Sequence, residues 1–464
     1  MQDKQPKKKA PRAKRSPLLE RVNPNAAGID CGAAMHYVAV PRDRDPEAVR
    51  SFKTFTNDLE RLADWLVQCG IKTVAMEATG VYWIPVFEII ESRGIQAVLV
   101  NAQHVKNVSG RKSDVSDSEW LQELHSVGLL RGSFRPKAEI VAMRSYLRHR
   151  ETLVQTAATC MNRVEKALLQ MNLQLHLVVS DLTGQTGLRI LRDIVSGEHD
   201  PRKLSRHRDA RCKASEDEIA GALTGHYRPE YLFVLKQNLD LFDSIQRQIS
   251  DCDAEVEQHL AILATRLKAP SSPLPAPRSR RKPRDNEPRF EVRQPLHVLS
   301  GVDLSQIDGI GPYSALKLIS ETGTDMSQWP TASHFTSWLT LAPRNRVSGG
   351  KMLSSRTQPS ANRAAVIFRM AALTLGRTQT ALGAFYRRLA FRIGKAKAIV
   401  ATARKIAILV YRSLKGEIAY KDPGAAAYDR INKESVLRRL RDRAQNLGFS
   451  LVSNETGQVL EGVS

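Results

Sequence analysis

The hydrophobic positions between residues 26 and 100 follow two different periods. Residues 26–40 mix small and β-branched residues and predict a strand, a turn and a second strand. Asn57 to Cys69 follows a helical period, and Val81 to Ser92 is a second predicted helix. Two short apolar runs, Ile71 to Met76 and Ile95 to Val100, are typical of buried strands. Because strands alternate with helices here, the pattern predicts an α/β layer.

From about residue 113 onward the pattern is mostly helical. A helix is expected to begin at Ser113 or Asp114 and to run to about Leu130, with an acidic first turn that suits a helix N-terminus. Two long proline-free stretches, Glu139–Gln174 and Leu232–Leu260, fit either a coiled coil or an ordinary helical bundle. Further helices are predicted over residues 361–376, 380–415 and 433–446.

Composition excludes several classes of protein. The chain has 464 residues, of which 42% are hydrophobic and 25% charged, so we expect a globular protein of two to four domains. No run reaches the ~18 apolar residues of a membrane-spanning helix, and the basic N-terminus lacks the apolar core of a secretory signal. The five cysteines form no C-x-x-C pair, which disfavours a disulfide framework and a cysteine zinc site.

The net charge of +22 is concentrated in three places. Residues 1–21 carry eight basic and two acidic side chains, and residues 270–295 combine an Arg cluster with seven of the 22 prolines, as in a linker or surface insertion. Residues 344–412 carry 15 basic side chains and no acidic one. An ordinary solvated surface interleaves both signs, whereas a surface that touches phosphates excludes carboxylates. The charge therefore favours a nucleic-acid partner over an ordinary solvated surface, and the glycine-rich and serine motifs that accompany this region, described below, make a membrane partner improbable.

Four acidic residues form the first candidate site. Asp30 and Glu77 lie at the ends of predicted strands, and Asp114 and Asp117 are three residues apart, on one face of a predicted helix. Such carboxylates are the oxygen ligands that Mg²⁺ needs for phosphodiester chemistry. The alternative is that each is a solvated carboxylate, with the helical pair merely complementing the helix dipole.

Two glycine-rich segments form the other candidates. Asp308-Gly309-Ile310-Gly311-Pro312 precedes a helical stretch and resembles a helix-hairpin-helix turn, in which backbone N–H groups at Gly309 and Gly311 approach a phosphate. A ligand-free Gly/Pro turn is the alternative.

The second segment places serines among cations. Ser348 precedes Gly-Gly-Lys351, and Ser354 and Ser355 follow; the surrounding cations are Arg344, Arg346, Lys351 and Arg356. Cations favour a serine alkoxide and stabilise charge on a phosphate, so any of the three serines is a candidate nucleophile, and a polar turn is the alternative.

Long motifs resemble a known family. AAGIDCGAAMHYVAVP, TVAMEATGVYWIPVFE, VNAQHVKNVSGRKSDVSDSEWLQELHSVGLLRGSFRP, GIGPYSALKLISETGTDMSQWP and SGGKMLSSRT-x-P-x-ANRAA are similar to the insertion-sequence transposases of family one-ten, subgroup eleven-eleven. The resemblance spans about residues 22–450. It implies an α/β plus all-α protein with an N-terminal RuvC-like (RNase H-fold) domain, a coiled-coil connector and a mostly helical transposase domain with a helix-hairpin-helix-like element. The implied parts are a basic disordered tail (1–21), the DEDD domain (22–135), the connector (136–265), a Pro/Arg-rich linker or insertion (266–295), the transposase domain (296–420) and a helical tail (421–464).

The resemblance also implies a chemistry. Asp30, Glu77, Asp114 and Asp117 match the family's metal-binding acids, and Ser348 matches its serine nucleophile. Arg363, in the ANRAA motif, joins the expected nucleic-acid-binding residues. Ala33 departs from the Lys found in other subgroups, so no catalytic role is expected there.

The implied partners follow from that chemistry. We expect Mg²⁺, DNA of the element ends and the target, a structured non-coding bridge RNA and a homo-oligomer, dimer or tetramer, in the bacterial cytoplasm at the nucleoid. Base pairing with the RNA would choose the sequence. Two alternatives stay open: a RuvC-like Mg²⁺-dependent DNA or junction nuclease without serine chemistry, and a non-catalytic nucleic-acid-binding derivative.

Overall fold

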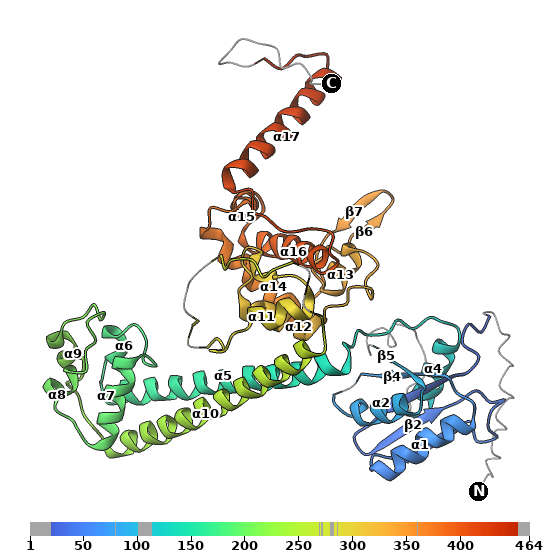
Figure 1. The fold of residues 1–464 in the computed structure, drawn as a ribbon, viewed down its shortest axis with the longest axis horizontal. Coiled ribbons are helices and arrows are strands. Elements are labelled where there is room, and N and C mark those ends of the chain that lie inside the picture. The colour runs from blue at the N-terminus through green and yellow to red at the C-terminus, as the bar shows by residue number, and fades with distance from the viewer. Residues whose placement is uncertain are drawn as a thin grey trace, which may run out of the picture. The chain divides into compact units, whose positions relative to one another are not determined.

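A computed structural model gives the fold (Figure 1). The structure describes residues 20–78, 80–100, 114–268, 270, 272–278, 283–284, 286–359 and 361–452. The chain divides into two compact units, Met1–Arg135 and Pro136–Ser464, which we describe separately.

The N-terminal unit is built on a five-stranded mixed sheet in the order β3-β2-β1-β4-β5. The strands are β1 (Ala26–Cys31), β2 (Met35–Ala39), β3 (Val49–Lys53), β4 (Thr73–Glu77) and β5 (Gln96–Val100). The first three pair antiparallel, whereas β1, β4 and β5 run parallel. The predicted α/β layer is therefore confirmed, and β3 is an addition that the hydrophobic pattern did not indicate.

Helices cover both faces of this sheet. They are α1 (Thr56–Gln68), α2 (Trp83–Ser92) and α4 (Asp114–Ser126). Ile29 and Met76 share a buried cluster with residues of α1 and α2, whereas Ala75 packs with Leu121 of α4. Successive strand residues thus alternate between the two faces. The last helix ends at Ser126, about four residues before the predicted end, because Gly128 takes a left-handed conformation (φ 72°).

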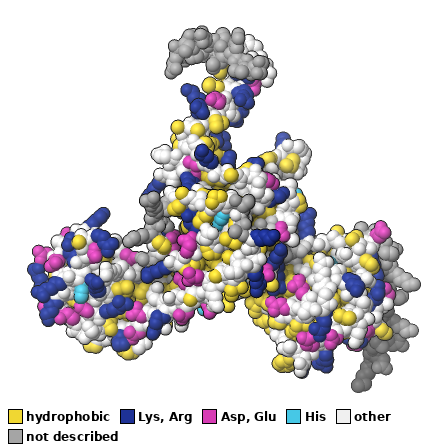
Figure 2. Space-filling view, in the orientation of Figure 1, with side chains coloured by type: hydrophobic (Ala, Val, Ile, Leu, Met, Phe, Trp, Pro, Cys, Tyr) yellow, Lys and Arg dark blue, Asp and Glu magenta, His cyan; other side chains and the backbone are white. Residues whose placement is uncertain are grey.

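The C-terminal unit begins with two long helices that pack side by side (Figure 1). They are α5 (Ala138–Gln170) and α10 (Pro229–Thr265), and they confirm the two predicted proline-free helices. One end of the pair shares a hydrophobic cluster with the segment between the two helices. That segment contains α6 (Leu175–Val178), α7 (Gln185–Ser196), α8 (Pro201–Ser205) and α9 (Glu216–Ala222). Cationic and anionic side chains interleave along this hairpin (Figure 2).

A second group of elements completes this unit. It contains α11 (Arg293–Ser300), η1 (Leu304–Gln306), α12 (Pro312–Thr322), α13 (Ala332–Trp338), β6 (Arg346–Ser348), β7 (Lys351–Ser354), α14 (Arg363–Thr374), η2 (Leu375–Arg377), α15 (Ala381–Ile393), α16 (Lys395–Leu414) and α17 (Ala425–Asn446). Phe335 is central to its core and contacts the rings of Trp329, Phe368 and Tyr411. The predicted helical stretch 380–415 is two helices, because Gly394 (φ 84°) breaks it.

The described parts of the Pro/Arg-rich segment lie against this second group. Arg278 donates a hydrogen bond to the carbonyl of Gln306 (2.7 Å), and the Gln306 amide donates one to the carbonyl of Ala276 (3.1 Å). Just after the segment, Arg293 binds the buried Asp303 carboxylate. Within the described residues, no helix is long and apolar enough to span a membrane.

Candidate functional site

Two of the predicted acids lie side by side on neighbouring strands. The parallel register of β1 and β4 pairs Ile29 with Met76, so Asp30 and Glu77 follow at the same level of the sheet. Both acids are half-buried. Since Ile29 and Met76 face α1 and α2, Asp30 and Glu77 point to the opposite face, which α4 covers.

Helix α4 lies directly on β1, antiparallel to it. The N–H of Asn23, just before β1, donates to the carbonyl of Ser126 at the end of the helix (2.8 Å). Further along, Gly28 lies against the backbone of Ser118 and Gln122, where a Cβ would come within 2.4 Å of each. Continuing in this direction, the first turn of the helix reaches the level of Asp30.

The helix that carries the other two acids therefore begins beside the first two. Asp117 lies in its first turn and is exposed. Asp114 begins the helix, but its side chain is outside the described residues. Among the side chains that the structure does describe, no group of three or more His, Cys, Asp or Glu is placed to hold a metal ion. Asp30, Glu77 and Asp117 thus share one face without forming such a group by themselves.

Burial and the same carboxylates raise the pKa of the Cys31 thiol. Burial, together with the negative charges of Asp30 and Glu77, raises its pKa to about 12. The Cys31 side chain belongs to the buried cluster shared with α1 and α2, on the face opposite the acids, so it is not placed to join them as a ligand. The remaining donors are carboxylate oxygens, which fit a hard divalent cation such as Mg²⁺.

Ser348 lies at the tip of a two-stranded hairpin. It ends β6, pairs with Lys351 of β7, and is exposed. The two residues between the strands, Gly349 and Gly350, both have positive φ (53° and 75°). A two-residue turn of this kind requires left-handed conformations at both positions, which explains the Gly-Gly pair. The geometry presents the Ser348 hydroxyl to solvent on a tight, well-defined turn.

The neighbouring serines differ from Ser348. The Ser354 hydroxyl accepts a hydrogen bond from the N–H of Arg356 (3.4 Å), as in a local turn, and Ser355 lies outside the hairpin strands. The carbonyl of Arg356 accepts from the N–H of Arg344 (3.0 Å), which closes the base of the hairpin.

The four cations of this segment are exposed, and within the described part of the chain none of them forms an ion pair; they are Arg344, Arg346, Lys351 and Arg356. Their charges are thus available to a polyanion around Ser348.

The two glycines before α12 serve different purposes. Gly309 has a positive φ (84°), and a Cβ there would come within 2.9 Å of the carbonyl of Ala371 on α14. Packing alone therefore accounts for this glycine. Gly311 is the N-cap of α12, and no atom lies within 4 Å of where its Cβ would be, so the start of the helix is open. The preceding Asp308 is buried and accepts a hydrogen bond from the Tyr420 hydroxyl (2.7 Å).

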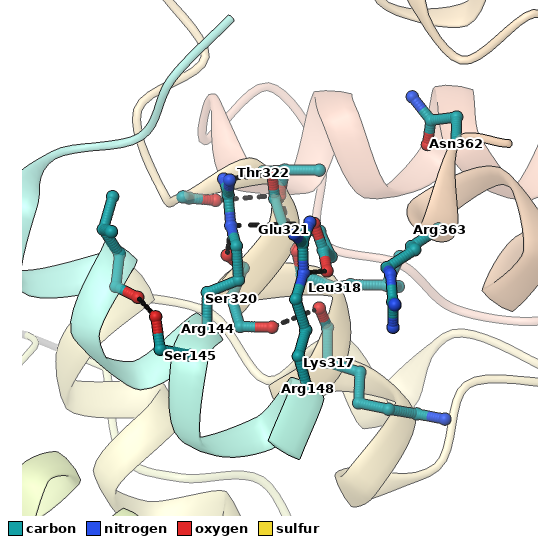
Figure 3. A network of polar contacts seen from close by, with 12 residues as sticks. Arg144, Ser145, Arg148, Lys317, Leu318, Ser320, Glu321, Thr322, Asn362 and Arg363 are labelled. Carbon is teal, nitrogen blue, oxygen red and sulfur yellow. Dashed lines mark hydrogen bonds and ion pairs between the residues drawn. The ribbon is translucent and has the colours of Figure 1, made fainter. Parts of the chain in front are cut away.

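The opposite end of α12 is fastened to α5 (Figure 3). Arg148 donates two hydrogen bonds to the Glu321 carboxylate (2.9 and 2.7 Å), and Arg144 donates to the terminal carbonyls of Ser320 and Glu321 (3.1 and 3.3 Å). Arg363, an expected nucleic-acid ligand, pairs with Glu151 of α5 (3.1 Å) and is about half exposed. Its charge is therefore shared with this network.

A second junction lies in the interior. The fully buried guanidinium of Arg150 binds the carboxylate of Asp253 on α10 (2.5 Å), the hydroxyl of Tyr313 on α12 and the carbonyl of Asn286. Nothing in the sequence identified Arg150 or Glu151, because their partners are up to 212 residues away.

Two family models match the chain. A transposase model of the DEDD type, named for IS110, matches residues 27–173, and the model of the transposase IS116/IS110/IS902 family matches residues 303–387. No curated protein sequence matched. The first match contains the acids on β1, β4 and α4, and the second contains the Gly311 turn and the Ser348 hairpin. Because both models describe the same family and together cover half of the chain, the protein belongs to the IS110 family of transposases, enzymes that cleave and rejoin DNA strands.

Proposed function

We propose that this transposase excises its insertion sequence and inserts it at a specific site through a serine ester. The observation that carries the proposal is the position of Ser348, exposed on a tight turn among cations with no ion-pair partner within the described residues. The exposed hydroxyl has room for a DNA phosphate, and the cations favour both the phosphate and the negative charge of the transition state.

In the proposed step the Ser348 oxygen attacks a DNA phosphorus. A bond forms between the serine oxygen and phosphorus, and the bond from phosphorus to a deoxyribose oxygen breaks. The serine proton passes to solvent, and the released deoxyribose oxygen takes up a proton. A hydroxyl of the recipient strand then attacks the ester and frees the serine. Because the serine ester conserves the free energy of the broken phosphodiester bond, strand exchange needs no nucleotide cofactor.

The acids on β1, β4 and α4 have the second role. A DEDD-type domain indicates dependence on a divalent metal, and we assign Mg²⁺ to Asp30, Glu77, Asp114 and Asp117 in a RuvC-like fold. The parallel register of Asp30 and Glu77 supports this assignment. When bound, the cation supplies Lewis-acid stabilisation of charge on the phosphate oxygens. Titration calorimetry should detect Mg²⁺ binding to the wild type and a loss of at least tenfold in affinity for Asp30→Ala.

The family resemblance and the basic surfaces support a further part of the proposal. A structured bridge RNA from the element pairs with element-end and target DNA, so that base pairing chooses the sequence and the protein contacts backbone. Several DNA ends must meet, which favours a dimer or tetramer acting at the nucleoid. Deleting the non-coding flank of the gene should abolish insertion, and supplying it from a second plasmid should restore it.

A trapping experiment tests the serine. Element-end DNA nicked beside the cleavage site should leave a covalent protein–DNA adduct on a denaturing gel. Ser348→Ala should remove the adduct, whereas Ser354→Ala, a matched change in the same hairpin, should keep it. Full strand exchange by Ser348→Ala would refute the serine mechanism, and DNA cleavage by the wild type without an adduct would instead indicate a nuclease that uses the acids alone. Full transposition by Asp30→Ala would refute the metal site, and a wild type without DNA cleavage would indicate a binding protein.

A further inference from the structure

The turn between α15 and α16 presents an unusually exposed aromatic ring. Phe391, in the last turn of α15, is 97% exposed. Within the described residues, the next most exposed large apolar side chain, Leu177, reaches 72%. A solitary exposed apolar side chain is ordinary, but a ring that contacts almost nothing on a rigid helix is available to a partner.

The helices on either side hold the ring in place. Tyr386 and Leu389 of α15 are buried with Ala398 of α16, so the two helices pack closely. Gly394 is the single residue between them and has φ 84°, which allows the sharp turn. Phe391 lies two residues beyond Leu389, which places it on the opposite side of the helix from the buried seam. The backbone at Phe391 is therefore held in place, and its ring is directed away from the core.

Three cations lie within six residues of Phe391 along the chain, at the end of α15 and the start of α16. Arg392, Lys395 and Lys397 are all exposed, and within the part of the chain that the structure describes none of them has an ion-pair partner. Residues 344–412 include no acidic residue. An exposed ring among unpaired cations suits a polyanion with flat apolar groups. Lysine is depleted from protein interfaces whereas Phe and Arg are enriched there, so the choice of partner rests on the two lysines and on the absence of carboxylates from residues 344–412.

This turn shares three residues with the first glycine turn. Ile393-Gly394 leads into α16 and Ile310-Gly311 leads into α12, and in both an alanine follows four residues after the glycine. Those alanines, Ala315 and Ala398, are buried (3% and 0% exposed). Each glycine is also the N-cap of its helix.

We propose that Phe391 stacks on an unpaired base of DNA while Arg392, Lys395 and Lys397 hold the flanking phosphates. Stacking on an aromatic side chain suits any base with an open face, and bases lose their neighbours where strands are cut and exchanged. DNA is the partner because the protein is a DNA transposase. The proposal rests on that activity and not on the serine or the metal.

The test uses the full-length protein and two DNA duplexes, one with a single unpaired 2-aminopurine and one with the same base paired. The wild type should prefer the unpaired probe and quench its fluorescence. Phe391→Ala should weaken binding of that probe by about 5-fold to 150-fold and remove the quenching, because this is the range of one base–aromatic stack. Phe391→Trp should retain both properties, and Phe233→Ala, at a 64% exposed position on α10, is the matched control.

Removal of the cations should have a different signature. Lys395→Gln with Lys397→Gln should weaken both probes equally and reduce the slope of log affinity against log salt by roughly 0.9 for each contact. Wild-type binding of the unpaired probe by Phe391→Ala would overturn the proposal, as would tenfold tighter binding to RNA of the same sequence. Because no cleavage is measured, a failed serine mechanism leaves this result unaffected.

Discussion

A single methyl group at Gly28 should separate the strand that carries Asp30 from the helix that carries Asp117. In Gly28→Ala the added carbon would lie 2.4 Å from the backbone nitrogen of Gln122 and 2.4 Å from the carbonyl oxygen of Ser118. Ordinary contact begins at about 3.4 Å, so α4 must move outward by roughly 1 Å. Both atoms belong to the helix backbone, so no side chain can rotate to relieve the clash.

Two magnitudes follow from this displacement. Overpacking of this kind costs about 1–3 kcal/mol. For a unit of this size, the cost corresponds to a fall of roughly 5–15 °C in its thermal midpoint. A shift of about 1 Å between reacting groups reduces an enzyme's rate by roughly 100-fold. The cleavage rate per folded molecule should therefore fall even at temperatures where the variant remains folded.

The assay pairs thermal unfolding with single-turnover cleavage of element-end DNA. Gly221→Ala is the matched control, because Gly221 lies in α9 with no atom within 4 Å of an added Cβ. That change should be neutral or stabilising, since alanine lowers the entropy of the unfolded chain. If Gly28→Ala matched the wild type in both midpoint and rate, the seating of α4 on β1 would be refuted.

Three further changes test other parts of the structure. Arg150→Met leaves the Asp253 carboxylate without its counter-charge and should lower the free energy of unfolding by about 3–5 kcal/mol in urea; a loss below about 1 kcal/mol would contradict the buried network. Burial alone would raise the pKa of Asp303, but hydrogen bonds from neighbouring side chains outweigh burial and lower it. The difference in free energy of unfolding between the wild type and Asp303→Asn should therefore be largest above pH 3.8, and it should narrow as the pH falls below that value. If this difference stayed unchanged on acidification, a lowered pKa of Asp303 would be refuted. Gly350→Ala should strain the turn (φ 75°) by about 1–2 kcal/mol and reduce the covalent adduct on a gel, while Gly350→Asn should restore it.

The sequence predicted those elements whose buried residues follow a clear period. Helix α1 is an example, because its apolar residues repeat at the helical spacing of its buried face, and β4 is another, because a short continuous apolar run is typical of a strand buried on both faces. Strand β3 (Val49–Lys53) escaped prediction because it is a sheet edge with mostly polar, partly exposed residues. The break between α15 and α16 at Gly394 was not predicted, because the helical period continues across it. An isolated glycine is also tolerated within a helix.

The candidate site shows the same division. Strand ends were predicted for Asp30 and Glu77, but their adjacency depends on β1 pairing with β4, a contact between distant segments. The hairpin at Ser348 carried a usable signal, since Gly-Gly between two short apolar-containing runs is typical of a two-residue turn. The pairing of Arg363 with Glu151 had none, because it joins residues 212 positions apart.

The attachment of α12 to α5 makes the long hairpin a lever. A helix of 33 residues is about 50 Å long. The arginines that grip Glu321 lie near the start of α5, so the far end of the hairpin moves as the long arm. Because the 22 residues of α5 beyond Arg148 span about 33 Å, a tilt of about 5° at that end displaces the tip by roughly 3 Å, and the reverse also holds. A partner that displaces the far end of α5 therefore rotates α12 by a small angle. The open turn at Gly311 moves with it.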